Sequence, residues 1–211
     1  MSRAELVIAW SRGWARSRGV PALVNIPGGL RLDIGRPGHR RRYVLHTWDP
    51  DYLREIGRNI STPGTWLKID CAAEELSAAL PPHWQMFETS YLMSAPLRPE
   101  RVDVPPPYLL TVGADQSRVV TATIRDRSGE TAASGRLAAA GGVGVIDQVE
   151  TAPGHRRRGL GTAVIQALTD HAARQGVRLG ILAATDDGRA LYRTLGWTSH
   201  TELATAFIPE P

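Results

Sequence analysis

The pattern of apolar and polar positions divides residues 1–95 into short alternating segments. Residues 3–17 have the spacing of an amphipathic helix, whereas residues 30–34 and 43–47 resemble the two strands of a hairpin. Beyond the hairpin the pattern predicts helix, strand, helix and strand in turn, at residues 51–59, 65–70, 72–80 and 85–94. These residues therefore form an α/β unit of their own, and we find no catalytic motif in it.

The later part of the chain is first rich in strands and then helical. Apolar runs predict an antiparallel series of strands at residues 108–112, 118–124, 131–140 and 143–151. A helix follows, because apolar residues recur every four positions, at Leu160, Val164, Leu168 and Ala172. Gln175-Gly176 is a typical helix end. A buried strand at residues 177–185 and a helix capped by Asp186 or Asp187 and ended by Gly196 complete the pattern.

A proline-rich stretch separates the two patterns. Residues 96–107 contain five prolines in twelve positions, which is typical of a linker. We therefore expect an N-terminal α/β lobe at residues 1–95, a linker at 96–107 and a second domain at 108–211. The predicted fold class is mixed α/β, with a mostly antiparallel sheet flanked by helices.

The junction between the strand at 143–151 and the following helix has the features of an anion site. Free amide N–H groups and the helix dipole favour anions at a helix N-terminus. Gly159 and Gly161 carry no Cβ, so that a phosphate can approach the backbone closely. Arg156, Arg157 and Arg158 add positive charge beside these amides. The pattern predicts a cradle for a pyrophosphate.

The string Pro-Gly-His-Arg-Arg-Arg occurs twice, at residues 37–42 and 153–158. The first copy continues into a strand-like run, with no glycines and no helix after it. It is therefore predicted to be the turn of the hairpin, and we interpret the repeat as coincidence.

Two motifs of the second domain resemble those of the GNAT superfamily of acyl-CoA-dependent N-acyltransferases. Arg156-x-x-Gly159-x-Gly161 resembles the R/Q-x-x-G-x-G/A signature, and residues 188–197 (GRALYRTLGW) resemble the motif A-x-x-L-Y-x-x-L-G-F/W. The resemblance covers about residues 108–207. It departs from the family at residues 113–117, where a turn replaces the usual helices that shape the acceptor pocket. The acceptor side is therefore expected to be built differently.

The resemblance implies direct transfer of an acetyl group from acetyl-CoA to an amine in a ternary complex, with no metal. It implies that the amides of Val149 and Thr151 pair with the pantetheine arm of coenzyme A. It also implies that the pyrophosphate is held by the following loop, which comprises Arg156, Arg157, Arg158, Gly159, Leu160, Gly161 and Thr162.

Three residues are candidates for the chemical step. Asp147 is the first choice as general base and Glu150 the second, since strand alternation predicts that Asp147 shares a face with Val149 and Thr151. The alternative for Asp147 is a structural carboxylate, hydrogen-bonded in the sheet or paired with an arginine. Tyr192 matches the family tyrosine that can protonate the leaving thiolate, and its alternative role is packing on an amphipathic helix.

The composition limits the classes of function. The net charge is +4 and Lys68 is the only lysine, but the arginines are interleaved with acids, so we expect a solvated surface rather than nucleic-acid binding. No run approaches a membrane span. The single cysteine, Cys71, excludes an internal disulfide framework and fits the cytoplasm. The expected partner is a small-molecule or peptide amine, and a homodimer is left open.

Several alternatives stay open. The protein could be a GNAT-fold module that binds acyl-CoA without turnover, or a dinucleotide-binding oxidoreductase, although the latter expects G-x-G-x-x-G. The first lobe holds five of the six tryptophans, as core anchors or as the lining of an acceptor pocket. A further hypothesis is that this lobe is a diverged half-copy of the second domain, packed over its acceptor site.

Overall fold

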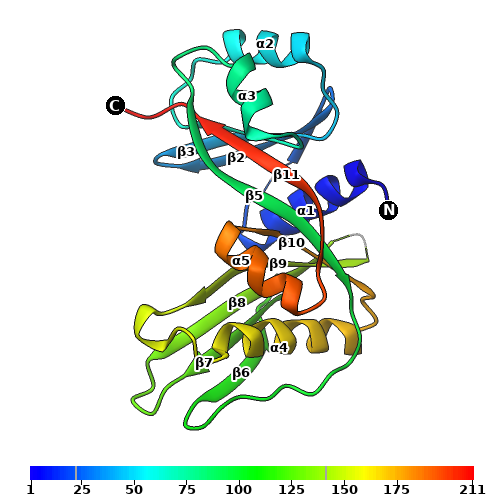
Figure 1. Cartoon of the computed structure of the whole chain (residues 1–211), viewed down its shortest axis with the longest axis vertical. Coiled ribbons are helices and arrows are strands. Elements are labelled where there is room, and N and C mark those ends of the chain that lie inside the picture. The colour runs from blue at the N-terminus through cyan, green and yellow to red at the C-terminus, as the bar shows by residue number, and fades with distance from the viewer. Residues whose placement is uncertain (22, 141) are drawn as a thin grey trace.

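The strands form one continuous twisted sheet in the computed structural model, which describes residues 1–21, 23–140 and 142–211. Within these residues eleven strands follow the order β1-β2-β3-β4-β11-β5-β10-β9-β8-β7-β6 (Figure 1). Neighbouring strands are antiparallel except for two parallel pairs, β3 with β4 and β9 with β10. The predicted class, a mixed α/β fold with a mostly antiparallel sheet flanked by helices, is confirmed.

The first half of the chain contains three helices and five strands. They are α1 (Arg3–Ser17), β1 (Leu23–Ile26), β2 (Gly29–Arg36), β3 (His39–Leu45), α2 (Pro50–Asn59), β4 (Thr65–Ile69), α3 (Ala73–Ala79) and β5 (Gln85–Pro96). All were predicted apart from β1, a four-residue edge strand that pairs with β2 alone. The hairpin turn was predicted too long, because residues 39–42 of the first Pro-Gly-His-Arg-Arg-Arg copy belong to β3.

The second half contains two α-helices, a 3-10 turn and six strands. They are β6 (Leu109–Ala114), β7 (Val119–Arg125), β8 (Thr131–Ala140), β9 (Val143–Thr151), η1 (Pro153–His155), α4 (Leu160–Arg174), β10 (Leu179–Ala184), α5 (Asp186–Thr194) and β11 (Thr198–Phe207). The strand β11 was not predicted. The cap of α5 was predicted wrongly, because the hydroxyl of Thr185, not Asp186 or Asp187, accepts the hydrogen bond of the Gly188 amide.

The two halves repeat one order of elements and exchange their last strands. In each half a hairpin leads through a helix to a parallel strand, and a second helix then leads to a final strand. The final strand β5 pairs with β10 of the second half, and the final strand β11 pairs with β4 of the first half. The strands β5 and β11 also pair with each other at the centre. The sheet thus runs across the proline-rich stretch at 96–107, and the division into two domains stays a prediction.

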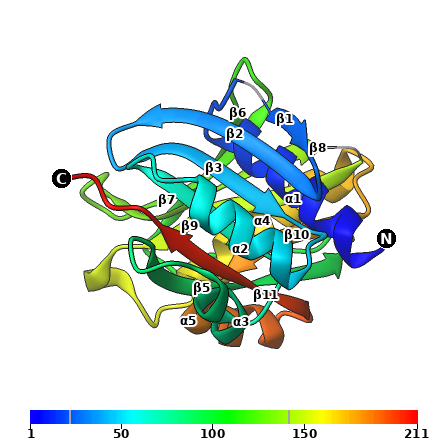
Figure 2. The same cartoon turned by 90° about the horizontal axis from the view of Figure 1, so that it is seen from above.

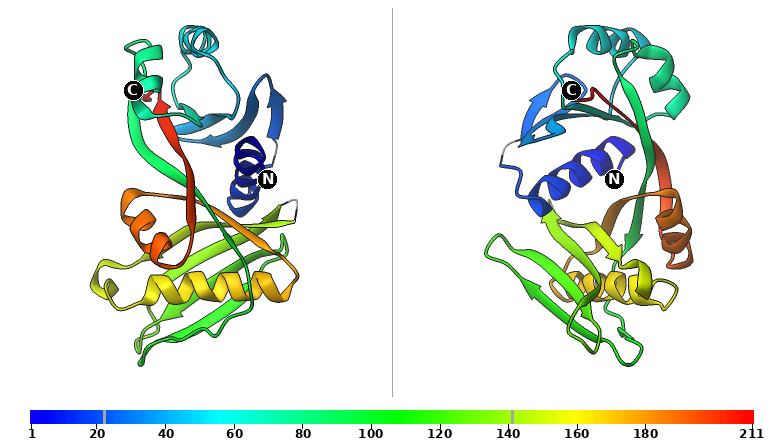
Figure 3. Two further views of the ribbon diagram at one scale, coloured as in Figure 1. Left: turned by 45° about the vertical axis from the view of Figure 1, so that its right-hand side comes forward. Right: turned by 90° about the vertical axis from the view of Figure 1, so that its left-hand side faces the viewer.

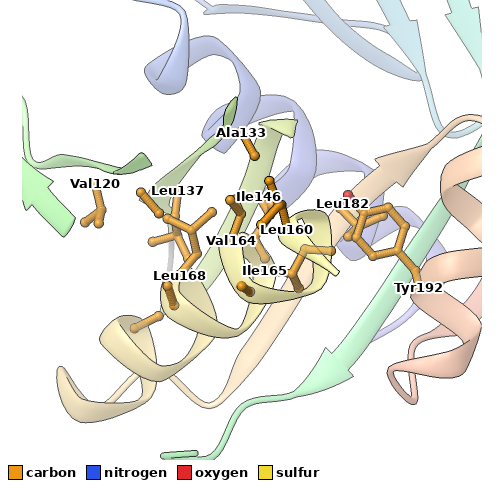
Figure 4. Close-up of a cluster of buried hydrophobic side chains, with 14 of the residues drawn as sticks. Val120, Ala133, Leu137, Ile146, Leu160, Val164, Ile165, Leu168, Leu182 and Tyr192 are labelled. Carbon is orange, nitrogen blue, oxygen red and sulfur yellow. The ribbon is translucent and has the colours of Figure 1, made fainter. Parts of the chain in front are cut away.

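Helices cover both faces of the second half of the sheet. On one face α4 packs against β7, β8 and β9, and the residues predicted for its apolar face, Leu160, Val164, Leu168 and Ala172, are all buried (Figure 4). On the opposite face α1 packs against β8, β9 and β10 and lies between the two halves (Figure 3). The helices α2 and α3 cover the end of the sheet around β4 and β11 (Figure 2). No helix in the described ranges is long and apolar enough to cross a membrane.

One glycine sets how closely α1 approaches the sheet. A Cβ added at Gly13, in the middle of α1, would lie 2.3 Å from the Cβ and Cγ2 of Val145 on β9. Because this distance is far below van der Waals contact, the helix rests directly on the valine side chain. The position of α1 over β9 therefore depends on a residue without a side chain.

We expect Gly13→Ala to destabilise the fold although alanine is the better helix former. Helix propensity favours alanine by about 1 kcal/mol, but overpacking a core contact typically costs about 1–3 kcal/mol. A lower free energy of unfolding in urea is the expected result. Gly113→Ala on β6, where an added Cβ meets no atom within 4 Å, is the control and should change stability little. A more stable Gly13→Ala variant would contradict the close packing of α1.

Candidate functional site

The parallel strands β9 and β10 separate at the centre of the sheet. They pair only from Leu179 with Val143 to Ile181 with Val145, although β9 continues to Thr151 and β10 to Ala184. The amide of Ala152, just after β9, donates to the carbonyl of Ala132 at 2.9 Å, on the β8 side. Because amides alternate along a strand, those of Val149 and Thr151 point to the opposite edge, into the gap. These are the two amides that the resemblance assigns to the pantetheine arm.

A β-bulge at Gln148 reverses the alternation of side chains between the two faces of the sheet along β9. Gln148 has φ 53°, and two residues of β9 oppose the single Gly135 of β8 between the pairs Ser134–Glu150 and Arg136–Asp147. Beyond this extra residue every side chain changes face. Val149 therefore packs toward α4, whereas Asp147 points toward α1. The prediction that Asp147 shares a face with Val149 and Thr151 is wrong for this reason.

The carboxylate of Asp147 is fully engaged by α1 and the residue after it. Its Oδ2 accepts from the Ser17 hydroxyl at 2.6 Å and from the Arg18 Nε at 2.8 Å, and its Oδ1 accepts from Arg18 Nη2 at 3.0 Å. The carboxylate lies where β9 no longer pairs with β10, which is where a general base would have to lie. Its pairing with an arginine is also the arrangement that we gave as the structural alternative.

A cleft of about 830 Å³ opens on the α4 side of the gap. It is lined by the end of β9, the loop that follows, and the starts of α4 and α5, including Val149, Thr151, Gly159, Gly161 and Thr185. Gly159 has φ 77° and precedes α4 without a side-chain cap, and Arg157 has φ 61°. Within the described residues no hydrogen bond occupies the amides of residues 157–162. The cleft thus has the free amides expected of a pyrophosphate cradle.

The three loop arginines differ in position. Arg156 and Arg157 line the cleft, and Arg156 Nε also donates to the carbonyl of Thr151 at 3.2 Å. Arg158 instead donates to the Tyr108 hydroxyl at 3.0 Å, and that hydroxyl lies 2.9 Å from Nδ1 of His155. The side chain of Arg158 therefore lies outside the lining of the cleft.

Glu150, the second candidate base, is exposed at the edge of this cleft. In the part of the chain that the structure describes, its carboxylate makes neither a hydrogen bond nor an ion pair. Leu160 and Thr162, the remaining loop residues of the predicted cradle, also line the cleft, where α4 begins.

Tyr192 lies on α5, inside the core beneath α4. Its ring is 8% exposed, lies beside Leu182 and makes an edge contact with Trp197 at 5.7 Å between centroids (Figure 4). Burial, with the nearby charge of Asp147, raises the pKa of the phenol far above its usual value, so that the hydroxyl stays protonated. The ring does not line the cleft, which agrees with the alternative that Tyr192 serves packing. The protonated phenol is also the form that a general acid requires.

A second cleft, of about 240 Å³, lies on the α1 side between the two halves. Residues from both halves line it, among them Trp14 and Arg18 of the α1 end, Arg42 of β3, Lys68 of β4, and Asp147 of β9. Thr185, at the end of β10, lines this cleft and the first one. The two clefts therefore approach each other at the gap between β9 and β10.

We did not predict this second cleft, although the sequence contains a sign of it. Lys68 is a charged residue in the middle of an otherwise apolar strand, and it is the only lysine in the chain. Three of the N-terminal tryptophans, Trp10, Trp14 and Trp66, line the cleft. Trp84, by contrast, is buried in the core beside α2 and α3, as the core-anchor alternative expected.

Solved structures with the same fold cover nearly the whole chain. A GCN5-related N-acetyltransferase from Kribbella flavida has 20% identity, covers 99% of this chain and 96% of its own, and gives a TM-score of 0.69. One from Sphaerobacter thermophilus has 14% identity, coverages of 98% and 92%, and a TM-score of 0.61. A tandem GNAT protein from the clavulanic acid biosynthesis pathway has 13% identity, coverages of 96% and 92%, and a TM-score of 0.57.

The sequence comparisons give the family. A search of curated proteins found no match. Residues 74–197, more than half of the chain, match the profile described as "Acetyltransferase (GNAT) family". The matched range contains the loop at 156–161, the gap between β9 and β10, and Tyr192. The chain therefore belongs to the GNAT acetyltransferase family.

Proposed function

We propose that the protein is an N-acetyltransferase that transfers the acetyl group of acetyl-CoA directly to a primary amine. The observation that carries this proposal is the pair of clefts on the two sides of the β9–β10 gap, which share Thr185. One cleft has the amides for a pyrophosphate, and the other reaches the same gap from the α1 side. A thioester and an amine can thus meet between the strands, in a ternary complex.

The first cleft is suited to coenzyme A. The pyrophosphate would lie on the free amides at the start of α4, with Arg156 and Arg157 beside it. The pantetheine arm would run along β9 and pair with the amides of Val149 and Thr151. The thioester would then lie where β9 and β10 separate.

The chemical step needs two proton transfers. The amine nitrogen attacks the thioester carbonyl carbon, a tetrahedral intermediate forms, and the C–S bond then breaks to release the thiolate of coenzyme A. We assign the proton of the amine to Asp147, directly or through water, with Glu150 as the second candidate. By its match to the family tyrosine, we assign the proton that the thiolate receives to Tyr192, whose phenol is protonated at neutral pH.

A second candidate function is a module that binds acyl-CoA without turnover. The contacts of Asp147 with Ser17 and Arg18 favour it, because both carboxylate oxygens already accept hydrogen bonds from the protein. Isothermal titration with acetyl-CoA and a thiol-release assay against a panel of amines separate the two functions. Binding without thiol release from any amine would support the module.

The cytoplasm stays the proposed compartment. A single cysteine, Cys71, excludes an internal disulfide framework, which fits the cytoplasm. Cys71 is also buried, and burial raises the pKa of its thiol to about 12, so that the thiol is unreactive. The proposed partner is an amine acceptor, not a nucleic acid or a membrane.

Coenzyme affinity should depend on Gly159. In Gly159→Val a branched side chain occupies a residue with φ 77° where the pyrophosphate would meet the backbone. We expect the Kd for acetyl-CoA to rise at least about tenfold, or roughly 1.4 kcal/mol, in isothermal titration. The control is Gly176→Val at the other end of α4, where φ is 84° and an added Cβ also meets no atom within 4 Å. Equal affinity in both folded variants would refute the cradle.

Turnover should depend on the hydroxyl of Tyr192. Tyr192→Phe keeps the ring in its packing against Trp197 and removes only the proton donor. We expect kcat to fall by about 10²-fold, as for a lost general acid, with the Kd for acetyl-CoA little changed. Near-normal kcat would show that the ring serves packing alone.

The base assignment predicts a pH dependence. In Asp147→Asn we expect kcat/KM at neutral pH to fall by about 10²-fold and to recover toward about pH 10, where the amine loses its proton unaided. Glu150→Gln is the control and should keep the wild-type profile. The assignment to Asp147 fails if its variant has the wild-type profile, and the role passes to Glu150 if only that variant changes.

A further inference from the structure

The cleft on the α1 side, defined above by Arg18, Arg42, Lys68 and Asp147, contains more positive than negative charge. Its lining carries three cations and two carboxylates. One carboxylate, Asp147, is bound by Arg18, and the other, Glu88, is exposed. Neither Arg42 nor Lys68 forms an ion pair within the described residues. In the described part of the chain the cleft thus contains two buried basic side chains that form no ion pair with a carboxylate.

Arg42 is the more unusual of the two. It is 8% exposed, and its guanidinium lies between the rings of Trp14 and Trp66, at 4.4 and 5.8 Å from their centroids. Contact with the rings is a cation–π interaction, which supplies no hydrogen-bond acceptor to the guanidinium N–H groups. Its buried Nε has no partner, and no other hydrogen bond of the side chain occurs in the described ranges. Burial and Arg18 lower its pKa to about 9, so it stays charged at neutral pH.

Lys68 lies on the same face of the sheet. The parallel register pairs Arg42 with Trp66 and Val44 with Lys68, so that all four side chains point toward α1. The ammonium of Lys68 is buried and donates to the Ser90 hydroxyl at 2.6 Å, and it lies 5.9 Å from the ring of Trp10. Burial, with the nearby Arg42, lowers the pKa of Lys68 well below its usual value, and an anion in the cleft would favour its charged form. In the described residues its amino group has no other hydrogen-bond partner than Ser90.

His39 adds a neutral polar atom to the cleft. Its Nε2 is buried and has no hydrogen-bond partner among the residues that the structure describes. Burial, with the neighbouring Arg42, Arg18 and Arg36, lowers the pKa of the ring to about 3, so the imidazole is neutral at pH 7. A neutral imidazole can donate one hydrogen bond to an anion.

A purely structural role does not account for these groups. Cation–π contact with tryptophan offsets only part of the free-energy cost of burying a charge without a counter-ion. A stacking role would also be served by a guanidinium paired with a carboxylate, as in the neighbouring Arg41, which binds Asp33 at 2.6 Å. The unpaired donors of Arg42, Lys68 and His39 instead converge on one cleft.

We propose that this cleft binds the acceptor through an anionic group, so that the acceptor is a small primary amine that also carries a carboxylate or a phosphate. This inference rests on the proposed acetyl transfer. Arg42 and Lys68 would hold the anionic group, and the tryptophans would contact the apolar part of the acceptor. The amine would point toward Asp147 and Thr185 at the gap. The nearby cations also favour the neutral form of the amine, which is the form that attacks.

The test compares primary amines in matched pairs that differ only in the anionic group. The pairs are phenylalanine and phenethylamine, tryptophan and tryptamine, 4-aminobutyrate and propylamine, and phosphoethanolamine and ethanolamine. The measurement is kcat/KM from thiol release with acetyl-CoA. We expect the anionic member of at least one pair to be preferred by at least about tenfold. The pair that shows this preference distinguishes a carboxylate from a phosphate.

The variant Arg42→Gln should reduce that preference to within about threefold. Arg41→Gln is the matched control, because Arg41 precedes Arg42 on β3 and is paired with Asp33. It should keep the wild-type ratio. The inference is overturned if the amines without an anionic group are preferred, or if Arg42→Gln keeps the full preference.

A titration without turnover separates this inference from the proposed function. The N-acetylated products of each pair are titrated into the wild-type protein with coenzyme A present. Tighter binding of the anionic product, lost in Arg42→Gln, supports the anion subsite even if no amine releases thiol, in which case the acetyl transfer alone is refuted. Equal binding of both products in every pair overturns the subsite. If Arg42→Gln does not fold, the wild-type ratios and Lys68→Gln decide in the same way.

Discussion

The end of pairing between β9 and β10 is the constraint on which the rest of the site depends. Two parallel strands that stay paired leave no free backbone between them, whereas here pairing stops after Val145 and Ile181. The bulge at Gln148 lies just beyond that point and turns Val149 and Asp147 toward opposite faces. One local irregularity therefore exposes two amides at the edge of β9. It also directs an acidic side chain toward α1 and away from the α4 side, where we place the coenzyme.

The N-terminal lobe supplies what the turn between β6 and β7 lacks. Family members usually place helices between their first two strands to shape the acceptor pocket, and this chain has only a short turn there. Helix α1 covers the corresponding face, because Gly13 lets it rest on Val145 and Arg16 donates to the carbonyls of Ser117 and Ala139. The end of α1 then brings Trp14 and Arg18 to Asp147. In the proposed function, the acceptor side would thus be built from a helix that precedes the sheet in sequence.

Most elements, though not β1 or β11, and the loop with free amides before α4 were predictable from the sequence, because they depend on local patterns. Apolar periodicity predicted the buried face of α4, and the glycines and arginines before it predicted the cradle. Longer-range features were not predictable in this way. The bulge at Gln148 has no sequence signature, since a glutamine with positive φ looks like any polar strand residue, and it reversed the face of Asp147. The orientation of Arg158 toward Tyr108 depends on a contact fifty positions away along the chain.

The exchange of the last strands has a consequence for how an acceptor enters. Because β5 pairs with both β10 and β11, and β11 also pairs with β4, separating the halves would break hydrogen bonds along three strand pairs. The cleft that lies between the halves is therefore fixed by the sheet and cannot open by a hinge between them. The buried side chains of Arg42 and Lys68 are already held at fixed positions before a ligand binds, so that binding costs little further side-chain conformational entropy. If the acceptor binds there as proposed, selectivity would follow from the match between these fixed basic groups and the acceptor, because a ligand without an anionic group would leave them unpaired.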